Sequence, residues 1–210
     1  MTQNQSGATP WEFESPSRHL SYNNKNKKII AYIIGVALGD GNLSNSNGRA
    51  VRLRITCDKK YPLLIKNIIK NLKIIFPNNK VSIVDRVNAV DISVYSNDLE
   101  NILGWKAKGG SKIIQKVCIP SWIKENLIYQ KECLRGLFQT DGSIYFDRGY
   151  IMVNFTSANF NLIKDVKDLL ENINFNVKIR KVVHKEKIKY VIRISKNTEK
   201  FIKTINLWKT

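Results

Sequence analysis

The sequence predicts an α+β fold built from two similar halves, each in the order helix, strand, strand, helix, strand, strand, helix. Three observations predict it. An apolar helix pattern that ends in an Asp-Gly pair occurs twice, segments of alternating apolar and polar residues follow each copy, and the elements come in the same order both times. An internal repeat of this kind indicates two halves related by a pseudo-two-fold axis.

Residues 25–104 are expected to form the first half. Residues 25–38 are apolar on most faces, which is typical of a buried helix. This helix should stop at residues 39–41, where Gly41 suits the left-handed conformation that follows a helix end. A hairpin with its turn at residues 44–48 should follow. The remaining elements are expected as strands at 49–57, 81–87 and 89–95, a helix at 61–76 that Pro77 ends, and a short helix at 96–103.

Residues 128–210 are expected to form the second half, because they repeat this order. Gly136, Asp141 and Gly142 take the places of Gly35, Asp40 and Gly41. After a helix and strand at 131–146, the remaining elements are expected as strands at 151–157, 177–183 and 188–195 and helices at 161–170 and 197–205.

Two segments lie outside the halves. Residues 1–24 are rich in Asn, Ser, Gln and Thr and are expected to form a flexible N-terminal arm. Residues 105–127 contain a Gly pair and are expected to form a basic, exposed connector, in which Ser121 caps a short helix that begins at Trp122. The lysines that make the connector basic are Lys106, Lys108, Lys112 and Lys116.

The charge balance indicates a polyanionic partner. The chain has 35 Lys and Arg against 17 Asp and Glu, a formal net charge of +18, and 43% hydrophobic residues. Such a chain can bury a core, and its excess positive charge favours nucleic acid over a membrane surface, because no long basic amphipathic helix stands apart from the core segments. A basic ribosome-associated protein is the plainer alternative.

The cysteines favour a reducing compartment. Cys57, Cys118 and Cys133 are odd in number and form no CxxC pair, so neither a zinc site nor a disulfide framework is readable, and buried thiols are expected. The N-terminus is polar, and no apolar run is long enough to span a membrane. We expect an intracellular protein of the cytoplasm, nucleoid or an organelle matrix, with no membrane partner.

The repeated helix end carries the chemistry. Small residues lie four apart on each helix, as Gly35 and Gly39 and as Gly136 and Thr140, so the two helices can pair closely and end together. Their carboxylates would then repel each other and oppose both helix dipoles. A divalent cation removes both problems, since carboxylates and main-chain carbonyls are the ligands that Mg²⁺ prefers. The expected metal ligands are Asp40, Asp141, Gly39 and Thr140.

At this point the sequence resembles the LAGLIDADG homing endonucleases. Residues 33–41 (IIGVALGDG) and 134–142 (LRGLFQTDG) are similar to the two copies of that motif, with the third-position glycine and the final Asp-Gly present both times. Leu38 departs from the motif in the first copy, and Gln139 and Thr140 depart in the second. These are helix-packing positions.

The resemblance covers the chain from about residue 25 to its end and implies a monomeric, double-motif enzyme that needs no protein partner. By the resemblance, Asp40 and Asp141 share about two or three Mg²⁺ ions, for which Ca²⁺ or Mn²⁺ can substitute. Each half would place a curved antiparallel sheet in the DNA major groove. Both strands of a long, rare double-stranded site would be cut across the minor groove, with short 3′ overhangs, and the implied role is mobility of an intron or similar element.

The polar face of each expected sheet supplies the candidate DNA contacts, because apolar and polar residues alternate along the strands. In the first half they are Asn42, Ser44, Arg52, Arg54, Arg86, Asp91 and Ser93. In the second half they are Ser143, Tyr145, Asn154, Lys178, Arg180, Lys189 and Arg193. Because the two sets differ, we expect an asymmetric target.

The resemblance also implies a basic residue near each scissile phosphate. Lys196 follows the last strand, where such a lysine is expected, whereas its repeat partner is Asn97. Lys59 is the second candidate, just beyond the first long strand. The two half-sites are therefore expected to differ in how they stabilise transition-state charge, and the two strands to be cut at unequal rates.

Three other functions remain open for this fold and charge. An RNA maturase would use the same basic surface on its own intron RNA. A DNA-binding regulator would keep the fold without cleavage, although it would have no reason to keep both Asp40 and Asp141. A structural ribosome-binding protein would have no reason to pair those carboxylates.

Overall fold

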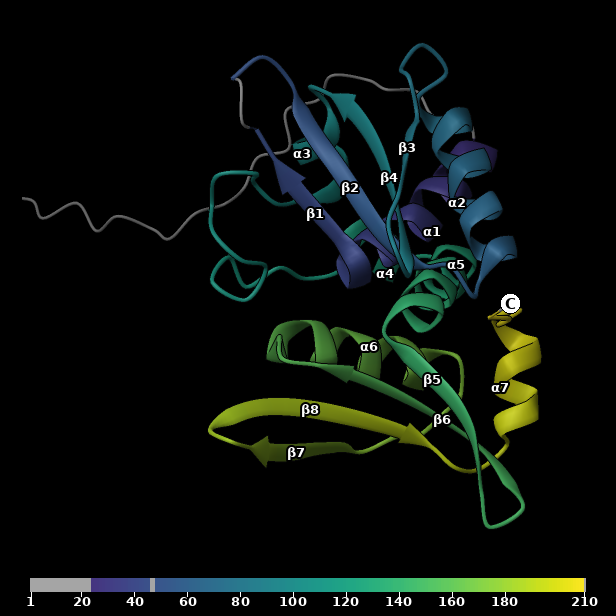
Figure 1. Ribbon diagram of the computed structural model, residues 1–210. Coiled ribbons are helices and arrows are strands. Elements are labelled where there is room, and N and C mark those ends of the chain that lie inside the picture. The colour runs from purple at the N-terminus through teal and green to yellow at the C-terminus, as the bar shows by residue number, and fades with distance from the viewer. Residues whose placement is uncertain (1–23, 46–47, 210) are drawn as a thin grey trace, which may run out of the picture.

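The computed structural model describes residues 24–45 and 48–209 of the 210-residue chain. Residues 1–23 of the expected arm lie outside the described residues, and Asn24 begins the first helix. Two α+β halves lie on either side of a central helix pair, with the purple and blue half above the green and yellow half in Figure 1. The predicted fold class is confirmed.

The first half contains three helices and four strands in the predicted order. Its bounds are α1 (Asn24–Asp40), β1 (Gly41–Ser44), β2 (Val51–Asp58), α2 (Pro62–Ile75), β3 (Ser82–Asp85), β4 (Ala89–Ser96) and α3 (Leu99–Leu103).

The second half repeats the series. Its bounds are α5 (Leu127–Thr140), β5 (Gly142–Asp147), β6 (Tyr150–Ser157), α6 (Phe160–Asn172), β7 (Ile179–His184), β8 (Lys187–Ile194) and α7 (Thr198–Thr204).

Each half contains one four-stranded antiparallel sheet. The strand orders are β1-β2-β4-β3 and β5-β6-β8-β7, so equivalent strands occupy equivalent places. Side chains on one face of each sheet, such as Leu53 and Ile92 in the first and Phe155 and Ile192 in the second, are fully buried. The apolar core therefore lies between each sheet and its helices, which leaves the opposite face of the sheet for polar groups.

The two halves meet where α1 and α5 pack backbone to backbone. A β-carbon added at Gly35 would lie 2.1 Å from the carbonyl oxygen of Cys133. One added at Gly136 would lie 2.4 Å from the carbonyl oxygen of Tyr32. Only a residue without a β-carbon allows this approach, so both glycines lie at the helix interface because of their size.

Gly41 does not have the left-handed conformation expected of it. It is the first residue of β1, and it is absent from the glycines of positive φ among the described residues. A β-carbon there would lie 2.5 Å from the carbonyl oxygen of Ala37, and Gly142 meets Phe138 in the same way at 2.3 Å. Glycine is needed at this motif position because the strand begins directly over the last turn of the helix, where a β-carbon would clash with the main chain.

The connector between the halves is exposed over much of its length, as expected, but several of its residues are buried. Val117, Ile119 and Ile123 are buried, and the Ile119 amide donates to Asp165 Oδ2 of α6 at 2.7 Å. A short helix, α4 (Ser121–Lys124), begins one residue earlier than predicted. Its N-cap is Pro120, with no side-chain cap, so the capping role given to Ser121 is wrong.

The expectation of buried thiols holds for two of the three cysteines. Cys57 and Cys133 are buried and free, whereas Cys118 is free but exposed. In the part of the chain that the structure describes, no helix has both the length and the apolar character needed to cross a membrane.

Candidate active site

The two motif carboxylates lie at adjacent helix ends. Asp40 is the last residue of α1, and Asp141 directly follows the last residue of α5. A β-carbon on Gly39 would lie 2.1 Å from Thr140 Oγ1 and 3.4 Å from Asp141 Cγ, so the two helix ends are in contact. The helix pair thus brings both carboxylates to one place, with Asp40 exposed and Asp141 half-buried.

Both carboxyl groups are shifted toward the protonated form. Burial raises the pKa of Asp141 to about 6, and the nearby charge of Asp40 adds to the rise while Lys112 and Lys209 oppose it. Partial loss of hydration also raises the pKa of Asp40, and the charges of Lys209 and Lys112 oppose this rise. A carboxylate pair in this state is stabilised by added positive charge.

Lys112 supplies one such charge at the end of α1. Its Nζ donates to the carbonyl oxygens of Ala37, Leu38 and Gly39 at 3.0, 2.6 and 2.7 Å. These are last-turn carbonyls that have no partner within the helix. Burial lowers the pKa of Lys112 to about 8, whereas the charges of Asp141 and Asp40 favour the ammonium form. Lys112 is therefore not part of an exposed basic connector.

Lys209 does the same at the end of α5. Its Nζ donates to the carbonyl oxygens of Thr140 and Gly142 at 3.0 and 2.8 Å. Burial lowers the pKa of Lys209, and the charges of Asp40 and Asp141 oppose this shift. The two lysines thus occupy corresponding places on the two motif helices.

The C-terminal segment that carries Lys209 is fixed by Gln139, which departs from the motif. Gln139 Nε2 donates to the carbonyl oxygen of Trp208 at 2.9 Å, and Gln139 Oε1 accepts from Tyr32 Oη at 2.7 Å. The Gln139 side chain is fully buried and joins α1, α5 and the C-terminal segment. This departure from the motif has a positioning role.

The donor set fits a hard divalent cation. Asp40, Asp141 and the carbonyls of Gly39 and Thr140 offer oxygen only, which Mg²⁺ and Ca²⁺ prefer. The two ammonium groups on those carbonyls mark a place that attracts positive charge. Across residues 24–45 and 48–209, no group of three or more His, Cys, Asp or Glu could hold a metal, so water or phosphate oxygens would complete the shell.

The first sheet presents a polar face, which we call the first open face. Strand pairing puts Asn42 opposite Arg54 and Ser44 opposite Arg52, and this face also carries Thr56, Tyr95 and Arg86. Arg52 donates to Ser93 Oγ from Nε at 3.2 Å and from Nη2 at 2.8 Å, and its guanidinium lies 5.9 Å from the centre of the Tyr95 ring.

Asp91 and Ser93 lie on the first open face but beneath its longer side chains. Their exposures are only 3% and 2%, so the expectation that they are accessible contacts is wrong. Asp91 accepts from Thr56 Oγ1 at 2.7 Å and from Arg86 Nη2 at 2.7 Å, which holds its pKa below the ordinary value. The two buried acceptors orient the arginines above them.

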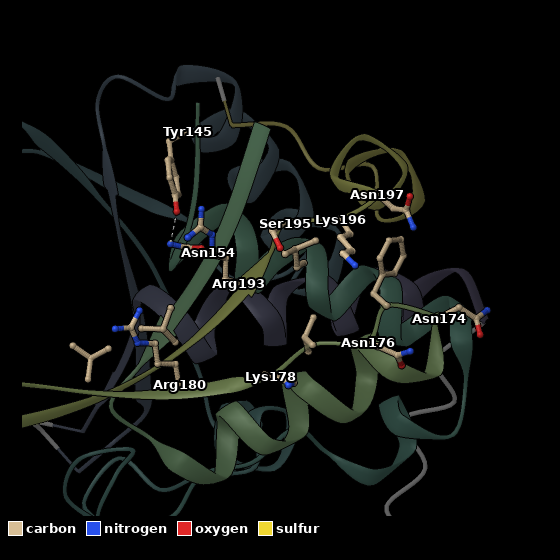
Figure 2. A pocket seen from close by; sticks show the side chains of 15 residues that line it. Tyr145, Asn154, Asn174, Asn176, Lys178, Arg180, Arg193, Ser195, Lys196 and Asn197 are labelled. Atoms are coloured by element: carbon tan, nitrogen blue, oxygen red, sulfur yellow. Dashed lines mark hydrogen bonds between the residues drawn. The ribbon is translucent and has the colours of Figure 1, made fainter. Parts of the chain in front are cut away.

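The second sheet has a corresponding second open face. The strand register places the expected residues Ser143, Tyr145, Asn154, Arg180, Lys189 and Arg193 on it. A hollow of about 730 Å³ lies on this face and is also lined by Lys178, which precedes β7 (Figure 2). Asn154 donates to Tyr145 Oη at 3.0 Å, and Arg193 pairs with Asp147 at 2.7 Å.

The two predicted catalytic lysines lie in different surroundings. Lys196 lines the hollow of the second open face together with Arg180 and Arg193, as Figure 2 shows. Lys59 lies at the end of the first open face, where its Nζ is 2.8 Å from Asp85 Oδ1.

Lys112 and Lys209 were not predicted as site residues, and the repeat explains why. A Trp-Lys pair follows the last helix of each half, as Trp105 and Lys106 in the first and as Trp208 and Lys209 in the second. The ammonium group of Lys106 instead lies 3.2 Å from Glu100 Oε2, and Lys112 reaches the end of α1. The repeated Trp-Lys pair therefore points to Lys209, but it suggests Lys106 in place of Lys112 as the counterpart. Thr56 and Tyr95 were also missed, although their strand parity could have found them.

Comparison with known proteins supports this reading of the fold. Residues 129–206 match the LAGLIDADG-like domain. The Replication factor C small subunit of Methanocaldococcus jannaschii is 26% identical over 185 residues, which cover 84% of this chain and 10% of that protein. The chain therefore spans about a tenth of the length of this relative.

Solved structures share the fold at low identity. The homing endonuclease I-DmoI in complex with DNA and Mn has a TM-score of 0.66 and 22% identity, covering 86% of this chain and 97% of that one. The N-terminal LAGLIDADG domain of DUF199/WhiA has a TM-score of 0.60 and 15% identity, covering 87% and 84%. Most of the second half thus matches the LAGLIDADG-like domain, both central helices end in a copy of the motif, and the chain shares its fold with I-DmoI.

Proposed function

We propose that the chain is a site-specific homing endonuclease that hydrolyses both strands of a long, asymmetric double-stranded DNA target, leaving short 3′ overhangs. The contact between the ends of α1 and α5, which brings Asp40 and Asp141 together between two polar sheet faces, is the observation that carries this proposal. I-DmoI, with the same fold, has been solved in complex with DNA and Mn and with DNA and Ca.

The two open faces would bind the DNA. The net charge of +18 supplies attraction to phosphates, and the arginines and lysines on the faces can contact phosphates and base edges. Arg52 and Arg86 are already held by Ser93 and Asp91, so less side-chain entropy is lost when they bind. The second open face carries Lys178, Arg180 and Lys189 instead, which supports an asymmetric target.

Asp40, Asp141 and the carbonyls of Gly39 and Thr140 would hold about two or three divalent cations, Mg²⁺ by preference and Ca²⁺ or Mn²⁺ as substitutes. A cation bound there supplies Lewis-acid activation of phosphodiester hydrolysis. The role of the protein is to hold the two carboxylates at one place, midway between the DNA-binding faces, so that both scissile phosphates come within reach.

Lys196 would stabilise negative charge at one scissile phosphate. It lines the same hollow as Arg180 and Arg193, so DNA bound on the second open face would pass close to its ammonium group. Lys59 is the candidate for the other strand and would have to exchange Asp85 for a phosphate. The different surroundings of Lys196 and Lys59 support unequal cleavage rates for the two DNA strands.

Two halves in one chain supply both DNA-binding faces, so we propose a monomer that acts inside the cell on a site associated with a mobile intron or similar element. Its own intron RNA is the alternative ligand that we propose for the basic surface.

The test is selection from a randomised duplex library incubated with Mg²⁺, and separately with Ca²⁺, followed by sequencing of the cut ends. Specific Mg²⁺-dependent ends with short 3′ overhangs are the expected result. Enrichment by binding without cutting in Mg²⁺ or Mn²⁺ would point to a DNA-binding regulator. No selectivity for DNA would direct attention to intron RNA as the ligand.

A further inference from the structure

Two lysine ammonium groups donate hydrogen bonds to carbonyl oxygens of the candidate metal site. Lys112 Nζ lies 2.7 Å from the carbonyl oxygen of Gly39, and Lys209 Nζ lies 3.0 Å from that of Thr140. Neither lysine belongs to the motif: Lys112 comes from the connector between the halves, and Lys209 comes from the C-terminal segment after α7. Gly39 and Thr140 are equivalent positions of the repeat, and the fact that lysines from different segments bind both indicates a requirement for positive charge at the two helix ends.

The contacts are too numerous for a simple surface lysine. Lys112 uses its three N–H groups on three consecutive carbonyls at the end of α1, and Lys209 bridges two carbonyls across the end of α5. Both side chains are partly buried, and each lies beside an aromatic ring, Trp105 for Lys112 and Tyr61 for Lys209. Each ammonium group is thus surrounded as a bound cation would be.

A divalent cation on these carbonyls would be opposed by the ammonium groups that already contact them. Mg²⁺ binds oxygen at about 2.1 Å and Ca²⁺ at about 2.4 Å. An ammonium hydrogen-bonded to the same oxygen would then lie within a few ångströms of a second positive charge, and the two would repel. The long lysine stem lets the ammonium move away without a change in the backbone.

We propose that Lys112 and Lys209 are built-in cations of the metal site, which hold the metal-ligand carbonyls in the metal-free protein and are displaced when a divalent cation binds. This inference rests on the proposed metal-dependent function. It assigns the lysines two roles, to stabilise the paired helix ends before the metal arrives and to weaken metal binding.

The experiment measures Ca²⁺ binding to the full chain by calorimetry, without DNA, in the wild type and in the double variant Lys112→Met/Lys209→Met. Methionine keeps the stem and removes the charge. We expect the double variant to bind Ca²⁺ about tenfold or more tightly, a gain of ~1.4 kcal/mol. We also expect the double variant to melt at a lower temperature than the wild type in EDTA. Its melting temperature should rise more on addition of Ca²⁺ than that of the wild type does. Lys164→Met, on the exposed surface of α6, is the matched control and should leave both quantities unchanged.

Unchanged or weaker Ca²⁺ binding in the double variant would overturn the displacement, and would give the lysines a purely structural capping role. Adding Asp141→Asn to the double variant should abolish the binding, which ties the ion to this site. If no variant binds Ca²⁺, both the displacement and the proposed metal site fail. If all variants bind it equally and Asp141→Asn abolishes binding, only the displacement fails.

A second pair of variants guards against loss of folding. Lys112→Gln and Lys209→Gln each retain an N–H donor for the carbonyls but carry no charge. Each should bind Ca²⁺ more tightly than the wild type, because the repulsion between cations is removed at one helix end. Equal affinity in these single variants would again contradict the displacement.

Discussion

Gly136 on α5 lies directly against the backbone of Tyr32 on α1, where a β-carbon would be 2.4 Å from the Tyr32 carbonyl oxygen. The atoms on both sides of this contact are main-chain atoms, so neither helix can yield without moving as a whole. The spacing of the helix pair, and with it the approach of the two carboxylates, is set by such contacts.

We therefore predict that Gly136→Ala destabilises the protein by about 2–3 kcal/mol, because an added methyl group would force the helices apart. For a chain of this size, that loss lowers the Tm by roughly 5–10 °C, measured by calorimetry or circular dichroism. Lys164→Ala, on an exposed helical surface, is the control and should change the Tm little. A normal Tm for Gly136→Ala would contradict the tight helix interface.

The second prediction concerns the carboxylates in catalysis. Asp40→Asn or Asp141→Asn should abolish double-strand cleavage while leaving DNA affinity largely intact, because neither side chain lies on an open face of a sheet. Cleavage is followed on a selected target in Mg²⁺, and binding is measured separately in Ca²⁺. A strong loss of binding in both variants would give the carboxylates a structural role instead.

The raised pKa of Asp141 predicts a dependence of stability on pH in the absence of metal. A folded-state pKa of about 6 against an ordinary value of 3.8 means that the folded protein binds this proton more tightly than the unfolded chain does. The stabilisation is present below pH ~4 and is lost as the pH rises through about 6, so the ionised carboxylate disfavours the folded state at neutral pH.

Asp141→Asn imitates the protonated acid. It should therefore stabilise the metal-free protein in EDTA at about pH 8 by roughly 1–2 kcal/mol of unfolding free energy, which is measured as a higher Tm. The advantage over the wild type should shrink at about pH 5, and it should reverse in saturating Ca²⁺ if the carboxylate is a metal ligand. A pH-independent difference between the two proteins would contradict the assignment of the shift to this group.

Most of the fold was readable from the sequence because the repeat constrains it. The spacing of small residues predicted the close helix pair, and strand parity predicted the open faces, since a period of two leaves little freedom once one face is apolar. The motif glycine was explained wrongly, because a tight contact with Ala37 and a left-handed turn both require glycine and look the same in a sequence.

The parts that could not be predicted depend on long-range contacts. Lys112 lies in a segment that reads as a solvated basic connector, and only the folded chain brings its ammonium group to the end of α1, more than seventy residues earlier in the sequence. Likewise, parity places Asp91 on the open face of the sheet, but its burial depends on Arg86 and Thr56 closing over it.

The difference between Lys196 and its repeat partner Asn97 leads to the last prediction. If Lys196 stabilises charge at one scissile phosphate only, Lys196→Met should slow cleavage of one DNA strand by about 10²-fold or more and leave the other strand nearly unchanged. Duplexes labelled on each strand separate the two rates, and nicked DNA should accumulate. Lys200→Met, on the exposed surface of α7, is the control for lost charge. Equal slowing of both strands would mean that Lys196 acts on DNA binding as a whole, because a change in affinity affects both cuts alike.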